Sequence, residues 1–326
     1  MRRSLAAVVV PLVLAASPVL AIKVGERTGG ERLSIDGYAH VQWALAYFPG
    51  AADASWQHYG FTLRRGRVQL EYEFTDRVAT TLEIGCDELD LEVKDASIGY
   101  RVGAPLRLVA GVQKMPFSRE ELRSSSRLVM VERSATNSWF DSLGYLGRDI
   151  GLVAAGELLP GGRPLGWALG VFNGNGARAV RDDNDAKQFA ERLTFEPARW
   201  LALGVNATQR NDSLSGRLMT AWGGDAALKF GPAAIEVEAL AADGDSAQTA
   251  LGAWLTGSVR LGSLEPAVRL ERFTPDLGDA GGATVTLCAG LNWYLHERVR
   301  LKANVTVVPG DAAAGNTLVV EAQAGF

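Results

Sequence analysis

Five basic side chains recur within one polar segment in the first half of the chain. They are Lys114, Arg119, Arg123, Arg127 and Arg133, and the acids of residues 114–139 are Glu120, Glu121 and Glu132. The segment therefore carries a formal charge of +2, whereas the whole chain carries −4. A guanidinium presents a planar fork of N–H donors that suits phosphate and carboxylate oxygens. This cluster of bases therefore predicts recognition of anions, and wherever such a segment lined a narrow opening its fixed charges would control which ions enter.

Six further bases fall on the polar side of segments in which apolar and polar residues alternate. They are Arg65, Arg67, Arg107, Arg269, Arg300 and Lys302. We expect them to extend the same basic path along a wall. Acids share that polar side, namely Glu71, Glu73, Glu236, Glu238 and Glu271. Each wall base could instead pair with such an acid and serve only the shape of the wall, so both roles stay open.

Residue types that would support catalysis or metal binding do not form a pattern. The histidines His40, His58 and His296 lack the spacing of metal ligands. A hydrolase would need a serine within reach of a histidine base, and only His40 lies on the polar side of a strand-like segment. We therefore predict no enzymatic activity, no metal and no cofactor. Cys86 and Cys288 fall on opposite faces of separate segments, so we expect two unpaired thiols.

The composition limits the elements that can position these side chains. Of 326 residues, 47% are hydrophobic and 21% are charged, and the mean hydropathy is +0.03. This balance excludes a disordered chain and a polytopic helical membrane protein. The absence of a basic surplus argues against nucleic-acid binding. Beyond residue 21, no apolar stretch approaches the roughly 20 residues of a spanning helix, so a membrane location would require a closed β-barrel.

The N-terminal segment is typical of an export signal. Two arginines precede an apolar run at residues 5–16, and small residues follow. A membrane anchor is the alternative, but the run is short and a serine–proline pair interrupts its end. We predict a signal peptide at residues 1–21 and one domain at residues 22–326, with a formal charge of −6 after cleavage.

Period-two alternation dominates the rest of the chain. In residues 33–47 the odd positions are apolar, and the even positions include Asp36, His40 and Gln42. Sixteen candidate strands begin near residues 33, 60, 77, 92, 105, 148, 165, 187, 200, 216, 233, 248, 265, 283, 298 and 316. The pattern predicts an all-β fold, namely a transmembrane antiparallel up-and-down β-barrel of about 16 strands.

The predicted connections alternate in length, as they do in outer-membrane barrels. Short turns contain residues 75–76, 103–104, 196–197, 231–232, 262–263 and 297, and longer loops contain residues 49–58, 86–91, 113–147, 174–186, 241–247 and 274–282. The third loop, 113–147, is the longest, and a capping-box pattern from Ser118 to Glu121 predicts a short helix there. Aromatic residues near the strand ends, among them Phe172 and Tyr294, suggest two interfacial girdles.

One strand breaks its alternation. Phe61 is apolar at an odd position, whereas Val68 and later residues are apolar at even positions. Without a phase correction Arg64 would face lipid, which costs about 2–4 kcal/mol near the midplane. We predict a bulge at Gly66 that turns the neighbouring arginines inward.

Between residues 60 and 195 a set of short motifs occurs in order. They are Phe61–Leu70, Glu73–Arg77, Asp95–Tyr100, Val112–Phe117 with Glu120–Leu122, Val131–Ser134, Gly147–Leu152 and Val171–Gly176. This set resembles the phosphate-selective porin family, the O and P type outer-membrane porins.

The resemblance implies a sixteen-stranded homotrimeric porin in the outer membrane of a Gram-negative cell. It also implies that the third long loop folds into the barrel and narrows the pore, and that Arg and Lys side chains there favour anions such as phosphate or polyphosphate. We therefore expect passive diffusion of small hydrophilic solutes with an anion preference, in contact with outer-membrane lipid. A non-selective or structural barrel with a plugged lumen and, less favoured, a barrel enzyme are the alternatives.

Overall fold

The computed structural model of the chain describes residues 24–27, 31–48, 55–103, 105–159, 162–176, 182, 185–212, 216–244, 248–279, 282–311 and 314–326. The signal peptide predicted at residues 1–21 lies outside the described residues. One antiparallel sheet accounts for nearly all of the regular structure in the described part.

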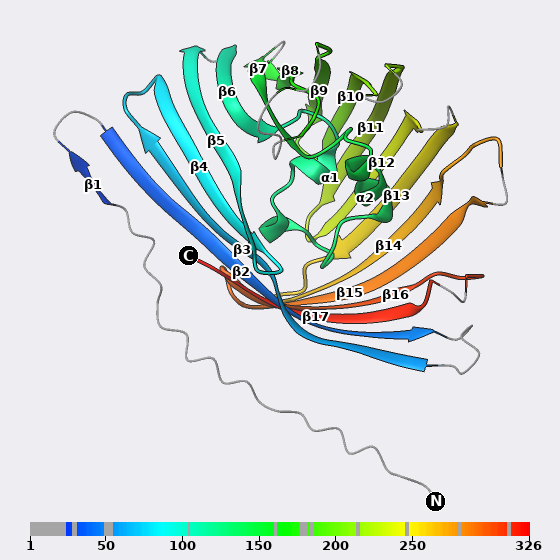
Figure 1. Ribbon diagram of the computed structural model, residues 1–326. Helices are drawn as coiled ribbons and strands as arrows, with labels where there is room; N and C mark the ends of the chain where they lie inside the picture. The colour runs from blue at the N-terminus through cyan, green and yellow to red at the C-terminus, as the bar shows by residue number, and fades with distance from the viewer. Residues whose placement is uncertain are drawn as a thin grey trace, which may run out of the picture.

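Sixteen strands close into a barrel, because each strand from β2 onward pairs with its successor and β17 pairs with β2 (Figure 1). The strands are β2 (Glu31–Phe48), β3 (Ser55–Glu73), β4 (Val78–Asp87), β5 (Asp90–Gly103), β6 (Leu106–Lys114), β7 (Arg148–Leu158), β8 (Leu165–Phe172), β9 (Gln188–Ala198), β10 (Leu201–Asn211), β11 (Leu218–Phe230), β12 (Ala233–Asp243), β13 (Thr249–Val259), β14 (Leu264–Thr274), β15 (Thr284–His296), β16 (Val299–Val307) and β17 (Asn316–Gly325). A short strand that the sequence did not predict, β1 (Val24–Arg27), pairs with the start of β2. The predicted fold class is confirmed.

Alternation along each strand separates two environments. In β2, His40 and Gln42 are buried inside the barrel, whereas Val41 between them is exposed on the outer surface. In β14, Arg269 is buried and its neighbour Leu270 is exposed. An apolar outer band suits lipid, and a polar interior suits water, so both faces match a membrane barrel.

The phase correction in β3 lies at Arg64, so the bulge predicted at Gly66 is misplaced by two residues. Arg65 and Leu63 lie opposite successive residues of β2, which leaves Arg64 as the extra residue. An extra residue moves the following side chains to the other face, and Arg65 and Arg67 are accordingly buried inside the barrel. Arg64 also reaches the interior, where its guanidinium binds a carboxylate of the third loop.

The prediction of a long loop at residues 86–91 is wrong. Strand β4 continues to Asp87 and β5 begins at Asp90, so only Glu88 and Leu89 connect them. Both connecting residues have a left-handed backbone, with φ of 51° and 71°. Two successive positive φ values match the twist of a tight hairpin, which explains why an acidic segment here does not form a long loop.

Two smaller predictions also change. The turn expected at residues 196–197 lies inside β9, and the chain turns at residues 199–200 instead. Phe172 and Tyr294 do not belong to interfacial girdles, because both side chains point into the barrel. Phe172 is buried there, and the Tyr294 hydroxyl donates a hydrogen bond to Glu265 at 2.6 Å.

The two cysteines are unpaired, as predicted. Cys288 is buried on the interior face of β15, with its Sγ atom 4.0 Å from the Sδ atom of Met130. Cys86 lies in β4, with its neighbour Gly85 on the interior side against Lys94. The two thiols therefore belong to different faces of the barrel wall.

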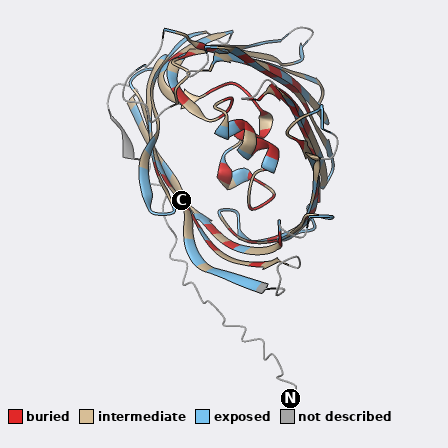
Figure 2. Ribbon diagram, turned by 45° about the vertical axis from the view of Figure 1, so that its right-hand side comes forward, coloured by how far each residue is buried: buried red, intermediate tan, exposed pale blue. Residues whose placement is uncertain are grey.

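The connection between β6 and β7, residues 115–147, folds into the barrel, and we call it the lumen loop (Figure 2). It contains α1 (Arg119–Leu122), the 3-10 helix η1 (Ser125–Arg127) and α2 (Ala135–Ser142). The Ser118 Oγ atom accepts a hydrogen bond from the N–H of Glu121 at 3.2 Å, which confirms the helix start predicted from the capping-box pattern. In the described part of the chain, no helix has the length and apolar character needed to cross a membrane.

Candidate functional site

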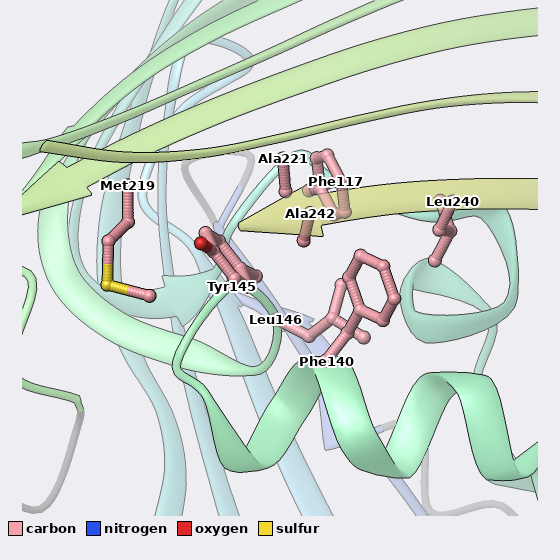
Figure 3. Packing of buried hydrophobic residues seen from close by; sticks show 8 residues of the cluster. All are labelled: Phe117, Phe140, Tyr145, Leu146, Met219, Ala221, Leu240 and Ala242. Carbon is pink, nitrogen blue, oxygen red and sulfur yellow. The ribbon is translucent and has the colours of Figure 1, made fainter. Parts of the chain in front are cut away.

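An apolar cluster docks the lumen loop against one side of the barrel. Phe117, Phe140 and Tyr145 of the loop are completely buried. They pack against β11 and β12 (Figure 3), and the cluster is completed by Leu146, Met219, Ala221, Leu240 and Ala242. Burial of a large apolar side chain contributes about 1.5–3 kcal/mol. The loop is therefore fastened to one side of the lumen by its own aromatic residues.

Two of the five predicted loop bases face this docking side. Arg123 forms a two-point ion pair with Glu236 of β12, with one N···O distance of 2.6 Å. Arg119 lies 3.4 Å from Asp225 of β11. Both guanidinium groups therefore hold the loop to the wall.

The other three loop bases are placed differently. Lys114 and Arg133 share the carboxylate of Glu121, at 3.4 and 3.2 Å, and both line the open side of the lumen. Arg127 is exposed, and its guanidinium pairs with no carboxylate among the described residues. The structure thus separates the five bases into docking, lining and free groups.

Three of the six predicted wall bases bind the main chain of the lumen loop. Arg269, Arg300 and Lys302 donate hydrogen bonds of 2.6–3.3 Å to carbonyl oxygens of residues 126–132. The side chain of Lys302 also pairs with Glu321 at 3.1 Å. Because these N–H donors bind loop carbonyl oxygens, the three bases hold the loop in place and have few donors left for a solute.

The remaining three wall bases lie on β3 and β6. Arg65 pairs with Glu132 of the lumen loop, and Arg67 pairs with Asp87 at 2.7 Å. Arg107 is exposed near the short turns and has no ion pair with the described residues. Pairing with acids, which the sequence left open, therefore holds for some wall bases and not for others.

Glu132 ties the lumen loop to β2 and β3. Its carboxylate accepts hydrogen bonds from Arg64 and Gln42, each at 2.9 Å, besides its contact with Arg65. Burial alone would raise the pKa of Glu132, but the charges of Arg65 and Arg64 outweigh burial and hold the pKa below its ordinary value. The carboxylate therefore stays ionised at an acidity that protonates an exposed glutamate.

A polar cavity of about 1310 Å³ lies between the lumen loop and strands β3–β7, and we call it the outer cavity. Among the described residues, eight bases and eight acids line it. On the wall, Arg148 lies 3.0 Å from Asp95, and Lys94 lies 2.8 Å from Asp87. The charges mainly pair with one another, so the cavity offers both donors and acceptors to a solute.

A second cavity of about 480 Å³ lies toward the short turns, and we call it the inner cavity. Arg101 and Arg107 face each other across β5 and β6, and Arg77 stands in the adjoining turn. Like charges directly opposite repel, and among the described residues none of these three has an ion pair. Asp95 lines both cavities, so the two lie next to each other along the lumen, and we call them together the passage.

Asp141 of α2 also lines the outer cavity, and no base of the described chain lies within ion-pair distance of it. Withdrawal from bulk water raises its pKa above the ordinary value of 3.8, and the nearby charge of Glu121 raises it further. The surroundings therefore shift the pKa of Asp141 upward and the pKa of Glu132 downward.

Sequence reasoning missed several charged groups of the passage. They are Glu83, Asp87, Lys94, Asp95, Arg101, Arg148 and Arg210. Arg148 lies inside the motif Gly147–Leu152, which offered a signal that was not used for the site. Lys94 is the extra residue of a bulge opposite Glu83 and Ile84, so strand phase alone could not place it inside.

A closed antiparallel barrel with an apolar outer band and a charged passage beside an inward-folded loop defines a transmembrane β-barrel channel. Residues 37–223, more than half of the chain, match the family model described as phosphate-selective porin O and P. The chain belongs to this family, as its motifs predicted, and is an outer-membrane porin. Family and fold are those of a channel rather than of an enzyme.

Solved porin structures share the fold at low sequence identity. OmpF of Salmonella typhi in complex with daunomycin aligns with a TM-score of 0.70 and 9% identity, covering 92% of this chain and 99% of its own. The anion-selective porin of Comamonas acidovorans aligns with a TM-score of 0.65 and 12% identity, covering 91% and 100%. OmpT of Vibrio cholerae aligns with a TM-score of 0.64 and 10% identity, covering 92% and 99%. No curated protein matches the sequence.

Proposed function

We propose that this porin lets small hydrophilic solutes diffuse passively and prefers anions, with phosphate-like ions as the favoured class. The observation that carries the proposal is the set of unpaired arginines in the inner cavity. Four bases and four acids of the described chain line this cavity. Arg77, Arg101 and Arg107 have no ion pair with the described residues, against two such acids, Glu71 and Asp76. Because described acids and bases are equal in number in both cavities, we infer that these unpaired guanidinium groups, rather than a net charge, favour anions.

The free arginines suit an anion that leaves bulk water. Each guanidinium offers planar N–H donors that replace lost hydration, and the opposition of Arg101 and Arg107 places two forks on one side of the passage. Arg127 on the lumen loop is a further exposed guanidinium without an ion pair among the described residues. Exposure keeps each contact weak, which release of the solute requires. We expect a modest preference rather than a tight site.

The same proposal covers export and assembly. Residues 1–21 serve as a signal peptide, residues 22–326 form one barrel domain, and three copies assemble in the outer membrane of a Gram-negative cell. Support comes from the motif pattern of the N-terminus and from the membership of the family.

Reconstitution in planar bilayers tests the function. In a KCl gradient we expect stepwise conductance with a reversal potential that favours chloride, and added phosphate should reduce the chloride current. Exchange of Arg101 and Arg107 together for Gln should lower the chloride-to-potassium permeability ratio about 2- to 5-fold. Arg199→Gln, in a turn at the same end and outside both cavities, is the matched control. Absence of steps would refute the porin, and a cation-favouring reversal potential would refute the preference.

A further inference from the structure

A glutamate of the barrel wall accepts hydrogen bonds from the first turn of α1. The N–H groups of Arg119 and Glu120 donate to the carboxylate of Glu238 at 2.5 and 3.3 Å, and the Ser118 hydroxyl donates to it at 3.0 Å. The N–H of Ser118 donates to Asn206 at 3.2 Å. The last N–H of this turn is capped by the Ser118 hydroxyl oxygen. All four donors at this helix start are therefore satisfied.

A second wall glutamate accepts hydrogen bonds from the first turn of α2 in the same way. The N–H groups of Ala135 and Thr136 donate to Glu271 at 3.1 and 2.6 Å, and the Thr136 hydroxyl donates to it at 2.7 Å. The N–H of Ser134 donates to Glu120 at 3.0 Å, and the Ser134 hydroxyl oxygen caps the fourth N–H. Each helix of the lumen loop thus begins on one glutamate of β12 or β14.

These two glutamates differ from the other acids that contact the loop. Both are at least 97% buried, and neither has a base within ion-pair distance among the described residues. A buried carboxylate is costly unless its charge and lone pairs are matched. Here the match is a helix start, where unsatisfied N–H groups and the positive end of the helix dipole favour an anion. Glu236 on the same strand is instead matched by Arg123.

We propose that Glu238 and Glu271 are the positioning residues of the lumen loop, and that they set the width and steadiness of the passage by holding α1 and α2 on the wall. The electrical consequence rests on the proposed diffusion function, whereas the placement of the loop does not. Loss of both carboxylates leaves the first N–H groups of α1 and α2 without their acceptors. The loop can then shift, and the width of the outer cavity changes with it.

The chain contains a native reporter of loop position. Cys288 is buried under Met130 of the lumen loop, which is itself 1% exposed. A charged, water-soluble methanethiosulfonate reaches the lumen but not the lipid face. It should therefore modify Cys288 only when the loop leaves the wall, and peptide mass spectrometry separates this site from Cys86.

The experiment compares E238Q, E271Q and their double variant with E265Q. Gln keeps the volume but loses the charge and one acceptor oxygen. Glu265 of β14 is the matched control, because in the described part of the chain its carboxylate accepts hydrogen bonds only from wall side chains, Ser258 and Tyr294. We expect Cys288 modification to accelerate about tenfold or more in the double variant, by a smaller factor in each single variant, and not in E265Q.

Single-channel recordings provide the second readout. We expect the double variant to change conductance by about 1.5-fold or more with added open-channel noise, while heat-modifiable migration on gels shows an intact barrel. Unchanged Cys288 modification in a folded double variant would overturn the proposal, and so would equal acceleration in E265Q. If the double variant does not fold, E271Q alone decides by the same labelling criterion. Absence of conductance in the wild type would refute the function and leave the labelling test intact.

Discussion

The two sides of the barrel use their charges differently. Strands β11–β16, which we call the anchor wall, direct charged groups to the lumen loop: Arg300 donates to its carbonyl oxygens and Glu271 accepts from its N–H groups. Strands β3–β7, which we call the open wall, pair some of their charges with one another, as Arg148 does with Asp95 and Lys94 with Asp87. In the described part of the chain, their ion pairs with the loop are confined to two of its carboxylates, Glu132 and Glu121, which bind Arg64, Arg65 and Lys114. One wall builds a structure inside the lumen, and the other faces the space that this structure leaves.

This difference shows that the number of interior bases does not by itself predict the selectivity of a pore. A guanidinium whose N–H groups bind loop carbonyls has few donors left for a solute, even though it remains charged. A guanidinium paired with a wall acid keeps its remaining donors in the passage, and an unpaired one, such as Arg107, keeps all of them. The partner of each base therefore matters more than its place on the interior face.

The largest expected effect is the loosening of the lumen loop when the apolar cluster that packs it against the anchor wall is disrupted. Phe140→Ala removes a completely buried ring from the cluster with Phe117 and Tyr145. We expect the docking of the lumen loop to weaken by about 3–5 kcal/mol, because a cavity replaces the ring. Limited proteolysis of the folded porin should then cut within residues 115–147. Phe189→Ala, which removes an exposed outer-face ring, is the control, and equal resistance of both variants would contradict the role of the cluster.

A smaller effect is expected at Gly252 of β13, where α2 leaves no room for a side chain. A Cβ atom there would lie 2.3 Å from the Thr136 side chain. Gly252→Ala should push α2 from the anchor wall at a cost of about 1–3 kcal/mol, and the open-channel current should become noisier. Gly257→Ala on the same strand has open space around its Cβ and should record like the wild type. Identical recordings from the two variants would show that α2 does not pack on β13.

The strands could be predicted because their signal is local. Alternation placed the first residues of β7, β8, β12 and β17 correctly at 148, 165, 233 and 316. The start of α1 was likewise readable from Ser118 and Glu121, since a capping box needs only four residues. The length of the lumen loop followed from the two strands on either side of it.

Pairing inside the lumen could not be predicted, because it depends on residues that are distant in sequence. Arg300 and Ser126 are 174 positions apart, and Gln42 and Glu132 are 90 apart. The position of the bulge in β3 was predicted wrongly for a related reason. The register of β3 against β2 decides which of several adjacent residues is the extra one, and this residue is Arg64. Local pattern indicated that a correction was needed but could not decide its position.

A direct test of the two walls exchanges one arginine on each. Arg148→Gln leaves Asp95 and Glu83 with less compensation in the outer cavity, so the chloride-to-potassium permeability ratio should fall about 2- to 5-fold. Arg269→Gln removes bonds to Glu120 and to a loop carbonyl but lies outside both cavities, so it should alter conductance while leaving that ratio near the wild-type value. Equal shifts of the ratio in the two variants would remove the distinction between the walls.

The smallest expected effect is a pH-dependent shift of the reversal potential, because two acids of the lumen loop have pKa values shifted in opposite directions. Asp141 has a raised pKa, so its charge disfavours the folded state at neutral pH, and this cost disappears as the pH falls through the raised value. Glu132 has a lowered pKa, so its stabilising charge is retained below its ordinary value of 4.5 and lost only at stronger acidity. As the pH falls through the raised pKa of Asp141, the outer cavity should therefore lose this negative charge, whereas the lowered pKa of Glu132 favours retention of the tie to the loop. Reversal potentials should shift slightly toward chloride in this pH range, and Asp141→Asn should already show the shift at pH 7. A shift that persists unchanged in Asp141→Asn would assign it to another carboxylate of the passage.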